Sequence, residues 1–237
     1  MGGAMAKGLI KAGLTDYLTL TAHTQKTLDT FTREWPTLKT SLNNSEAVRG
    51  ADIVILAVKP WLIDEVMEEI TPALGTACVI SVAANKEHDR IDVYAMPNIA
   101  AEFNQSMTFI SNEGKAENIR KAEELFSLLG EAKTVTPRQL QAGMMMAGCG
   151  IAYVMRFLRA MTEGGVEMGF YPNDAKEIAM QTMQGAITLL QETGLHPEAA
   201  IDKVTTPGGV TIKGLNELDH AGFNSAVIRC LKAGLNK

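Results

Sequence analysis

The first half of the chain alternates between two hydrophobic patterns. Short runs rich in Val, Ile, Leu or Tyr are typical of buried strands, and stretches with apolar residues three or four positions apart are typical of amphipathic helices. We expect strands at residues 17–22, 52–58, 77–82, 91–96, 106–110 and 132–135. We expect helices from the N-terminus to Gly13 and over residues 25–34, 61–70 and 115–129. This alternation predicts an α/β fold whose mostly parallel sheet is covered on both faces.

From Pro137 onward only helical periodicity is evident. The expected helices cover residues 140–168, either as one helix or as two joined near residue 149, then 172 to about 192, then 196–203, with two more around Gly222. The domains are therefore predicted at residues 1–136 and 137–237.

The first of these helices is apolar on all sides. Its apolar residues include Met144, Met145, Met146, Ile151, Tyr153, Val154, Met155, Phe157 and Leu158. A helix of this kind is normally buried, and a helical half of this size makes only a thin core. We expect a homodimer; the alternative is a monomer that packs this helix on its own sheet.

Composition narrows the function classes. The net charge of −5 gives no broad basic surface, so binding to nucleic acid or to an anionic membrane is not expected. The three cysteines, Cys78, Cys149 and Cys230, and the four histidines lack metal-site spacing. Reduced cysteines, with no signal pattern and no uninterrupted apolar run of about 18 residues, predict a cytoplasmic protein.

Gly2 stands at the start of the first expected helix. In a βαβ nucleotide-binding unit a strand and two further glycines precede such a helix, and this sequence does not contain them. We therefore expect either that the true start lies upstream or that the part that holds pyrophosphate has been lost. The alternative for Gly2 is a simple helix cap at a chain end.

Three strand ends carry candidate cofactor residues. After the first strand come His23, Thr24 and Lys26 with no acidic residue, which favours the 2′-phosphate of NADP(H) over the ribose hydroxyl of NAD; the alternative is a solvated loop. The strand at 52–58 ends in Ala57-Val58-Lys59-Pro60, and the strand at 91–96 leads into Pro97-Asn98. Ligands bind at such strand ends, although each could also be an ordinary turn.

The segment 204–211 contains Pro207-Gly208-Gly209 directly before a helix expected from Ile212 to His220. Backbone N–H groups in such a turn can converge on an anion, and the helix N-terminus adds a positive dipole end. This favours a carboxylate site. The alternative is an ordinary connection between helices.

Together these motifs resemble the pyrroline-5-carboxylate reductase family. The matching segments are residues 1–9, 44–47, 57–60, 96–98, 164–166 and 204–215, in order and spacing. The resemblance implies a Rossmann domain without its first strand, followed by a helical domain that dimerises by interleaving helices. It also implies reduction of 1-pyrroline-5-carboxylate to L-proline, in proline biosynthesis, with NADPH or alternatively NADH as cofactor.

The resemblance also assigns residues. Those implied for the cofactor are Gly2, His23, Thr24, Asn44, Ala57, Val58, Lys59, Pro60, Ala83 and Asn98. The implied substrate site is Gly208, Gly209, Val210 and Thr211. There, N–H groups of Gly209, Val210 and Thr211 would hold the carboxylate, and the Thr211 hydroxyl would hydrogen-bond the imine nitrogen.

The chain departs from the family pattern near this site. Cys149 and Ile151 stand where the family has Ser and Pro, and Gln141, Met144 and Lys203 also differ. Asn85 replaces a family glycine. Two alternatives to the reductase therefore stay open: a catalytically impaired structural or regulatory relative, and a reductase of another small cyclic imine.

Overall fold

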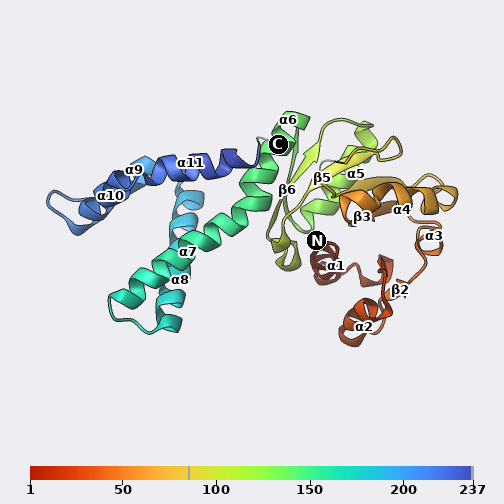
Figure 1. The fold of residues 1–237 in the computed structure, drawn as a ribbon, viewed down its shortest axis with the longest axis horizontal. Helices are drawn as coiled ribbons and strands as arrows, with labels where there is room; N and C mark the ends of the chain where they lie inside the picture. The colour runs from red at the N-terminus through yellow and green to blue at the C-terminus, as the bar shows by residue number, and fades with distance from the viewer. Residues whose placement is uncertain (85, 236–237) are drawn as a thin grey trace. The chain divides into compact units, whose positions relative to one another are not determined.

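The computed structural model describes residues 1–84 and 86–235 (Figure 1), so the predicted departure at Asn85 lies outside the described residues. The chain forms two compact units, Met1–Cys149 and Gly150–Lys237, each treated separately below. The first unit extends past residue 136 because the following helix packs on its sheet. A Cβ at Gly143 would lie 2.5 Å from the Phe109 ring, so glycine lets this helix approach closely.

The first unit contains two sheets. β1 (Thr19–Thr21) pairs in parallel with β2 (Lys39–Ser41). The larger sheet has the order β3-β4-β5-β6-β7. Its strands are β3 (Ile53–Leu56), β4 (Cys78–Ser81), β5 (Val93–Met96), β6 (Ser106–Ser111) and β7 (Gly130–Val135). All neighbours are parallel except β5 and β6, which are antiparallel.

The α-helices of this unit are α1 (Gly2–Lys11), α2 (Gln25–Glu34), α3 (Asn44–Ala47), α4 (Ile63–Ile70), α5 (Ala116–Ser127) and α6 (Pro137–Gly143). Four of them, α1, α2, α4 and α5, agree closely with the predicted ones, whereas α3 was not predicted and α6 begins three residues before the expected start. The 3₁₀ helices are η1 (Thr15–Tyr17), η2 (Pro60–Leu62), η3 (Thr71–Ala73) and η4 (Ile99–Phe103). A π-helical turn, Met144–Cys149, follows α6.

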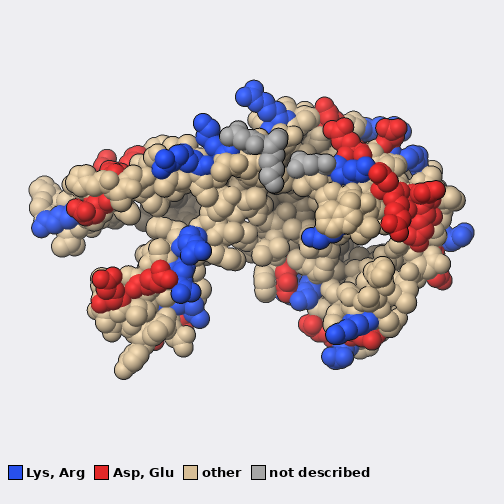
Figure 2. Space-filling model, viewed as in Figure 1, with Lys and Arg blue, Asp and Glu red and all other residues tan. Residues whose placement is uncertain are grey.

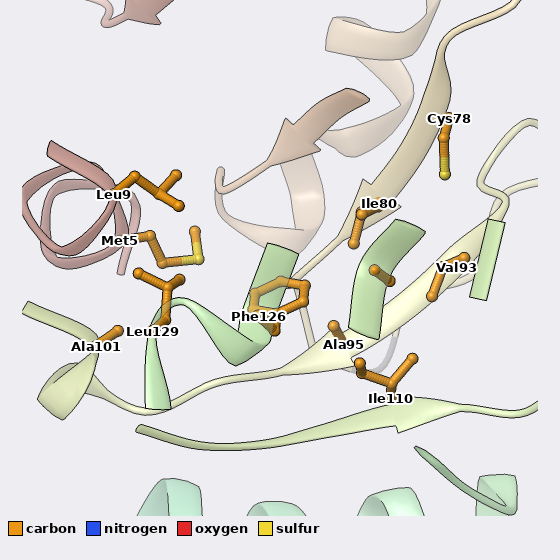
Figure 3. Close-up of a cluster of buried hydrophobic side chains, with 11 residues drawn as sticks. Met5, Leu9, Cys78, Ile80, Val93, Ala95, Ala101, Ile110, Phe126 and Leu129 are labelled. Carbon is orange, nitrogen blue, oxygen red and sulfur yellow. The ribbon is translucent and has the colours of Figure 1, made fainter. Parts of the chain in front are cut away.

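Alternate side chains of the parallel strands enter two different cores, as expected for a sheet covered on both faces. In β4, Cys78 and Ile80 join a cluster with α1 and α5, whereas Val79 joins a cluster with α4. Figure 3 shows the first cluster, in which Met5 and Leu9 of α1 lie close to Leu129. Every member of this first cluster is at most 3% exposed. The prediction of an α/β fold with a mostly parallel sheet is thereby confirmed.

α1 also takes part in a third, smaller cluster. Ala6 and Ile10 pack with Phe31 of α2 and with Leu38, which precedes β2. The small sheet is therefore held to the rest of the first unit through α1 and also through α3, where Asn44 and Ser45 both hydrogen-bond to Glu69 of α4. Among the described residues β1 pairs only with β2, and β3 only with β4.

The second unit is helical throughout its described residues. It contains α7 (Gly150–Glu167), α8 (Pro172–Thr193), α9 (Pro197–Lys203), α10 (Val210–His220) and α11 (Phe223–Ala233). α7 and α8 pack closely, because a Cβ at Gly165 would lie 2.9 Å from that of Ala175. Met146, at the end of the first unit, and Val154, Met155 and Phe157 of α7 are exposed within this single chain. The sequence led us to expect that a second copy covers these residues, and their burial in a homodimer stays a prediction.

α6, the π-helical turn and α7 form one helix, Pro137–Glu167, of 31 residues with a mean hydropathy of 1.2 over its most apolar window. By length and composition alone, this helix could cross a membrane. The sequence pattern did not predict such a segment, because its apolar run is interrupted. Only 11% of that window is buried, so the helix needs a cover from elsewhere.

Candidate functional site: the carboxyl edge of the sheet and the start of α10

The parallel strands β3, β4 and β5 end at one edge of the sheet, where predicted cofactor residues follow them. Ala57, Val58, Lys59 and Pro60 come directly after β3, and Pro60 begins η2. Ala83 follows β4, is 5% exposed and donates its N–H to the Ser81 hydroxyl (3.2 Å). Asn98 follows β5. The fold therefore brings three of the predicted cofactor segments to one edge.

The N-terminus of α1 lies at this same edge. A Cβ at Gly2 would lie 3.1 Å from that of Ala57, so the absence of a side chain lets the helix start close to the end of β3. No side chain caps this helix, and its first turn contains no acidic residue. The first N–H groups of a helix lack intrahelical acceptors and favour an anion. A phosphate group fits this end.

The candidate 2′-phosphate residues lie at the start of α2. His23, Thr24 and Lys26 are exposed, and the first turn of α2 has no acidic residue. The Thr24 hydroxyl accepts a hydrogen bond from the N–H of Thr27 (3.4 Å), which caps the helix. Asn44, at the start of α3, donates its side-chain N–H to Glu69 (2.9 Å). Its amide is therefore already engaged within the chain.

Asn98 is the centre of a buried polar cluster that the sequence did not predict. It is 7% exposed, and its Oδ1 accepts from the N–H of Ala100 (2.9 Å). Its Nδ2 donates to the carbonyl of Ala147 (3.4 Å), and its backbone N–H donates to the Ser106 hydroxyl (3.1 Å). Ser106 in turn shares a hydrogen bond with Thr108 (3.1 Å). The backbone carbonyl of Asn98 also accepts a hydrogen bond, from the N–H of Ala101 (3.1 Å), so its side-chain and backbone polar groups are engaged within the chain.

The predicted substrate segment lies in the second unit, at the start of α10. The helix begins at Val210, two residues earlier than expected, with Gly209 as its N-cap and Gly208 in the left-handed region (φ 73°). The N–H of Gly209 donates to the carbonyl of Thr206 (2.9 Å). The expectation that Gly209 offers its N–H to an anion is therefore wrong. The N–H groups of Val210 and Thr211 fall in the first turn, where helices leave donors free.

Gly208–Thr211 and the sheet edge belong to different units. That Thr211 lies beside the cofactor edge, either within one chain or across a dimer, stays a prediction.

Acidic side chains gather over α4, as Figure 2 shows. The four on this helix are Asp64, Glu65, Glu68 and Glu69.

Near the end of β3, the Lys59 Nζ lies 6.0 Å from the centre of the exposed Trp61 ring. Among the described residues no group of three or more His, Cys, Asp or Glu could hold a metal ion. The chemistry available here is binding and orientation, without a metal centre built from these side chains.

A parallel sheet whose carboxyl edge meets an uncapped helix N-terminus, followed by an all-helical unit, defines a two-domain dinucleotide-dependent oxidoreductase. Residues 137–237 match the family model for pyrroline-5-carboxylate reductase dimerisation, and residues 1–85 match that of the coenzyme F420-dependent NADP oxidoreductases. The chain belongs to the pyrroline-5-carboxylate reductase family.

Individual relatives agree with this assignment. Pyrroline-5-carboxylate reductase 1 of Dictyostelium discoideum is 35% identical over all of this chain, which spans 47% of that protein. The Methanosarcina acetivorans reductase is 33% identical, over 97% of this chain and 91% of its own length. The structure of Plasmodium falciparum pyrroline carboxylate reductase with NADP bound has a TM-score of 0.86 at 22% identity, covering 98% of this chain and 90% of that one. The predicted family, enzyme class, role in proline biosynthesis and use of NADP(H) are confirmed.

Proposed function

We propose that this chain reduces 1-pyrroline-5-carboxylate to L-proline as a cytoplasmic homodimer, with NADPH along the carboxyl edge of β3–β5 and the substrate at the start of α10. The observation that carries the proposal is the uncapped N-terminus of α1 beside Ala57, because it offers an anion site where the parallel strands end. The three free cysteines, Cys78, Cys149 and Cys230, support a reducing compartment.

NADPH, when bound, supplies the hydride. The chain's own residues would orient and neutralise it: the first turn of α1 would face a phosphate, and Ala57–Pro60, Ala83 and Asn98 would line the edge of the sheet beside it. His23, Thr24 and Lys26 offer a cation and hydrogen-bond donors to a 2′-phosphate. Asn44, at the start of α3 in the same unit, is a further candidate residue for the cofactor. This set favours NADPH over NADH.

The substrate half of the site needs little acid–base chemistry. The N–H groups of Val210 and Thr211 hold the carboxylate at the positive end of α10, and the Thr211 hydroxyl hydrogen-bonds the imine nitrogen as it becomes an amine. Holding the two rings at contact distance supplies most of the rate enhancement. This division of labour explains why no charge-relay group is required.

The homodimer solves the burial problem of the second unit. Its exposed large apolar residues lie mainly on the two long helices and include Val154, Met155, Phe157, Val166, Ile178 and Ile187. Exposed apolar surface of this extent marks an interaction site, and a second copy covers the long helix without a membrane. The match of residues 137–237 to a dimerisation model supports this arrangement.

The decisive experiment follows NADPH absorbance with 1-pyrroline-5-carboxylate and, separately, NADPH binding by fluorescence. Turnover that depends on the pyrroline carboxylate supports the proposal. Binding of NADPH without turnover of this substrate, but with turnover of another cyclic imine, would transfer the proposal to that imine. If the protein showed no NADPH binding and no turnover, the result would favour a structural or regulatory relative. The departures from the family pattern at Met144 and Cys149 motivate that alternative.

A further inference from the structure

We propose that Asn98 is a positioning residue that holds the π-helical turn Met144–Cys149 in one hydrogen-bond register beside the carboxyl end of β5. The inference rests on the proposed function, because the turn affects catalysis only if this edge of the sheet binds the cofactor. The side chain acts through the backbone of the turn and need not touch the substrate.

The hydrogen bonds fix the orientation of the Asn98 amide. The N–H of Ala100 can only donate, and it lies 2.9 Å from one end of the amide, which must therefore be the oxygen. The NH₂ end then faces the carbonyl of Ala147 at 3.4 Å. One nearly buried side chain thus joins the first turn of η4 to the π-helical turn.

A π-helical turn contains i→i+5 hydrogen bonds, which are rarer than the α pattern and occur often at functional sites. If the turn relaxed to the α register, the helix beyond it would shift by one residue, which is a rotation of about 100° about its axis. A donor that engages the carbonyl of Ala147 therefore favours the π register of this turn over the α register.

The positions of the family departures add weight to this segment. Met144 opens the π-helical turn and Cys149 closes it, and both differ from the residues that the family pattern leads us to expect. The bond from Asn98 is the long-range polar contact to this turn among the described hydrogen bonds.

Three variants of the full chain test the inference. Asn98→Asp keeps an oxygen for the N–H of Ala100 but loses the donor to Ala147, and Asn98→Ala loses both without adding charge. The matched control is Asn104→Asp, at the other end of η4, where the Asn104 amide donates to the carbonyls of Gly8 (3.0 Å) and Leu128 (2.6 Å). It removes the same kind of donor and adds the same charge.

Hydrogen–deuterium exchange of residues 144–150 reports on the turn, and steady-state kinetics report on the site. Loss of one hydrogen bond should speed this exchange about three- to tenfold in both Asn98 variants and leave it unchanged in Asn104→Asp. Asn98→Ala should also raise KM for 1-pyrroline-5-carboxylate.

Unchanged exchange in the Asn98 variants, an equal increase in Asn104→Asp, or faster exchange with an unchanged KM in an active enzyme would each overturn the inference. An inactive wild-type protein would instead refute the proposed function, and the exchange rates would still decide whether Asn98 holds the turn.

Discussion

The contact between α1 and η4 permits a sharp prediction, since Gly8 lies against backbone. A Cβ at this position would lie 2.1 Å from the carbonyl oxygen of Ala101 and 2.6 Å from Cδ2 of Leu129. Carbon and carbonyl oxygen normally approach no closer than about 3.3 Å. Gly8→Ala therefore forces α1 away from η4 by about 1 Å, because the carbonyl, unlike a flexible side chain, cannot rotate away.

The cost follows from two opposing effects. Overpacking of a filled core costs about 1–3 kcal/mol, and the rigid neighbour places Gly8→Ala at the upper end. Alanine stabilises a helix by about 1 kcal/mol relative to glycine. The net loss is about 2 kcal/mol, and the hydrogen bond from Asn104 to the Gly8 carbonyl is stretched as well. We expect the urea midpoint, measured by circular dichroism at fixed protein concentration, to fall by roughly 1 M.

Gly3→Ala in the same helix is the control. Its added Cβ would meet only the Phe31 ring at 3.4 Å, an ordinary contact. It should leave the stability unchanged or raise it by up to about 1 kcal/mol, because alanine favours a helix over glycine and meets no clash here. If Gly8→Ala and Gly3→Ala unfold at the same urea concentration, the close approach of α1 to η4 is not a property of the folded protein.

Three further outcomes are expected. Thr211→Ala should lower kcat with the fold intact, whereas Thr211→Ser, which keeps the hydroxyl, should have a kcat close to that of the wild type. If Thr211→Ala turned over as fast as the wild type, Thr211 would not belong to the site. Met155→Glu, on the exposed apolar surface of α7, should give a monomer by light scattering, and a persistent dimer would contradict the interface. Burial, and to a smaller extent the negative charge of Asp92, raises the pKa of the Cys78 thiol from 9.0 to about 11. The unfolded thiol ionises first, so stability should fall between pH 9 and 11, and a Cys78→Ala variant that kept this slope would argue against the cause.

The sequence predicted the strands that enter the two cores because their apolar runs are continuous. It missed β2, Lys39–Ser41, which is short, polar and largely outside those cores. The antiparallel β5–β6 pair was also not predicted, although the evidence was present. The connection between the two strands, residues 97–105, is too short for the crossover that a parallel pair requires.

For the site, residues at strand ends were predictable, because parallel strands bring their carboxyl ends to one edge. The contacts of Asn98 were not, since they join residues 49 positions apart in sequence. The π-helical turn was hidden because a run such as Met144-Met145-Met146 is apolar at every position and carries no periodicity. Gly8 gave no signal either, because a glycine within a helical pattern does not reveal which backbone it approaches.

The double attachment of α1 also governs how the first unit opens. Met5 and Leu9 lie in the core of the large sheet, whereas Ala6 and Ile10 lie in the small cluster with Phe31. Thermal fluctuations that detach this helix would therefore loosen both clusters at once, whereas β1 and β2 stay attached through α3, where Asn44 and Ser45 hydrogen-bond to Glu69 of α4. The candidate 2′-phosphate residues His23 and Thr24 lie between β1 and α2, so a dinucleotide bound there and at the start of α1 would slow this loosening.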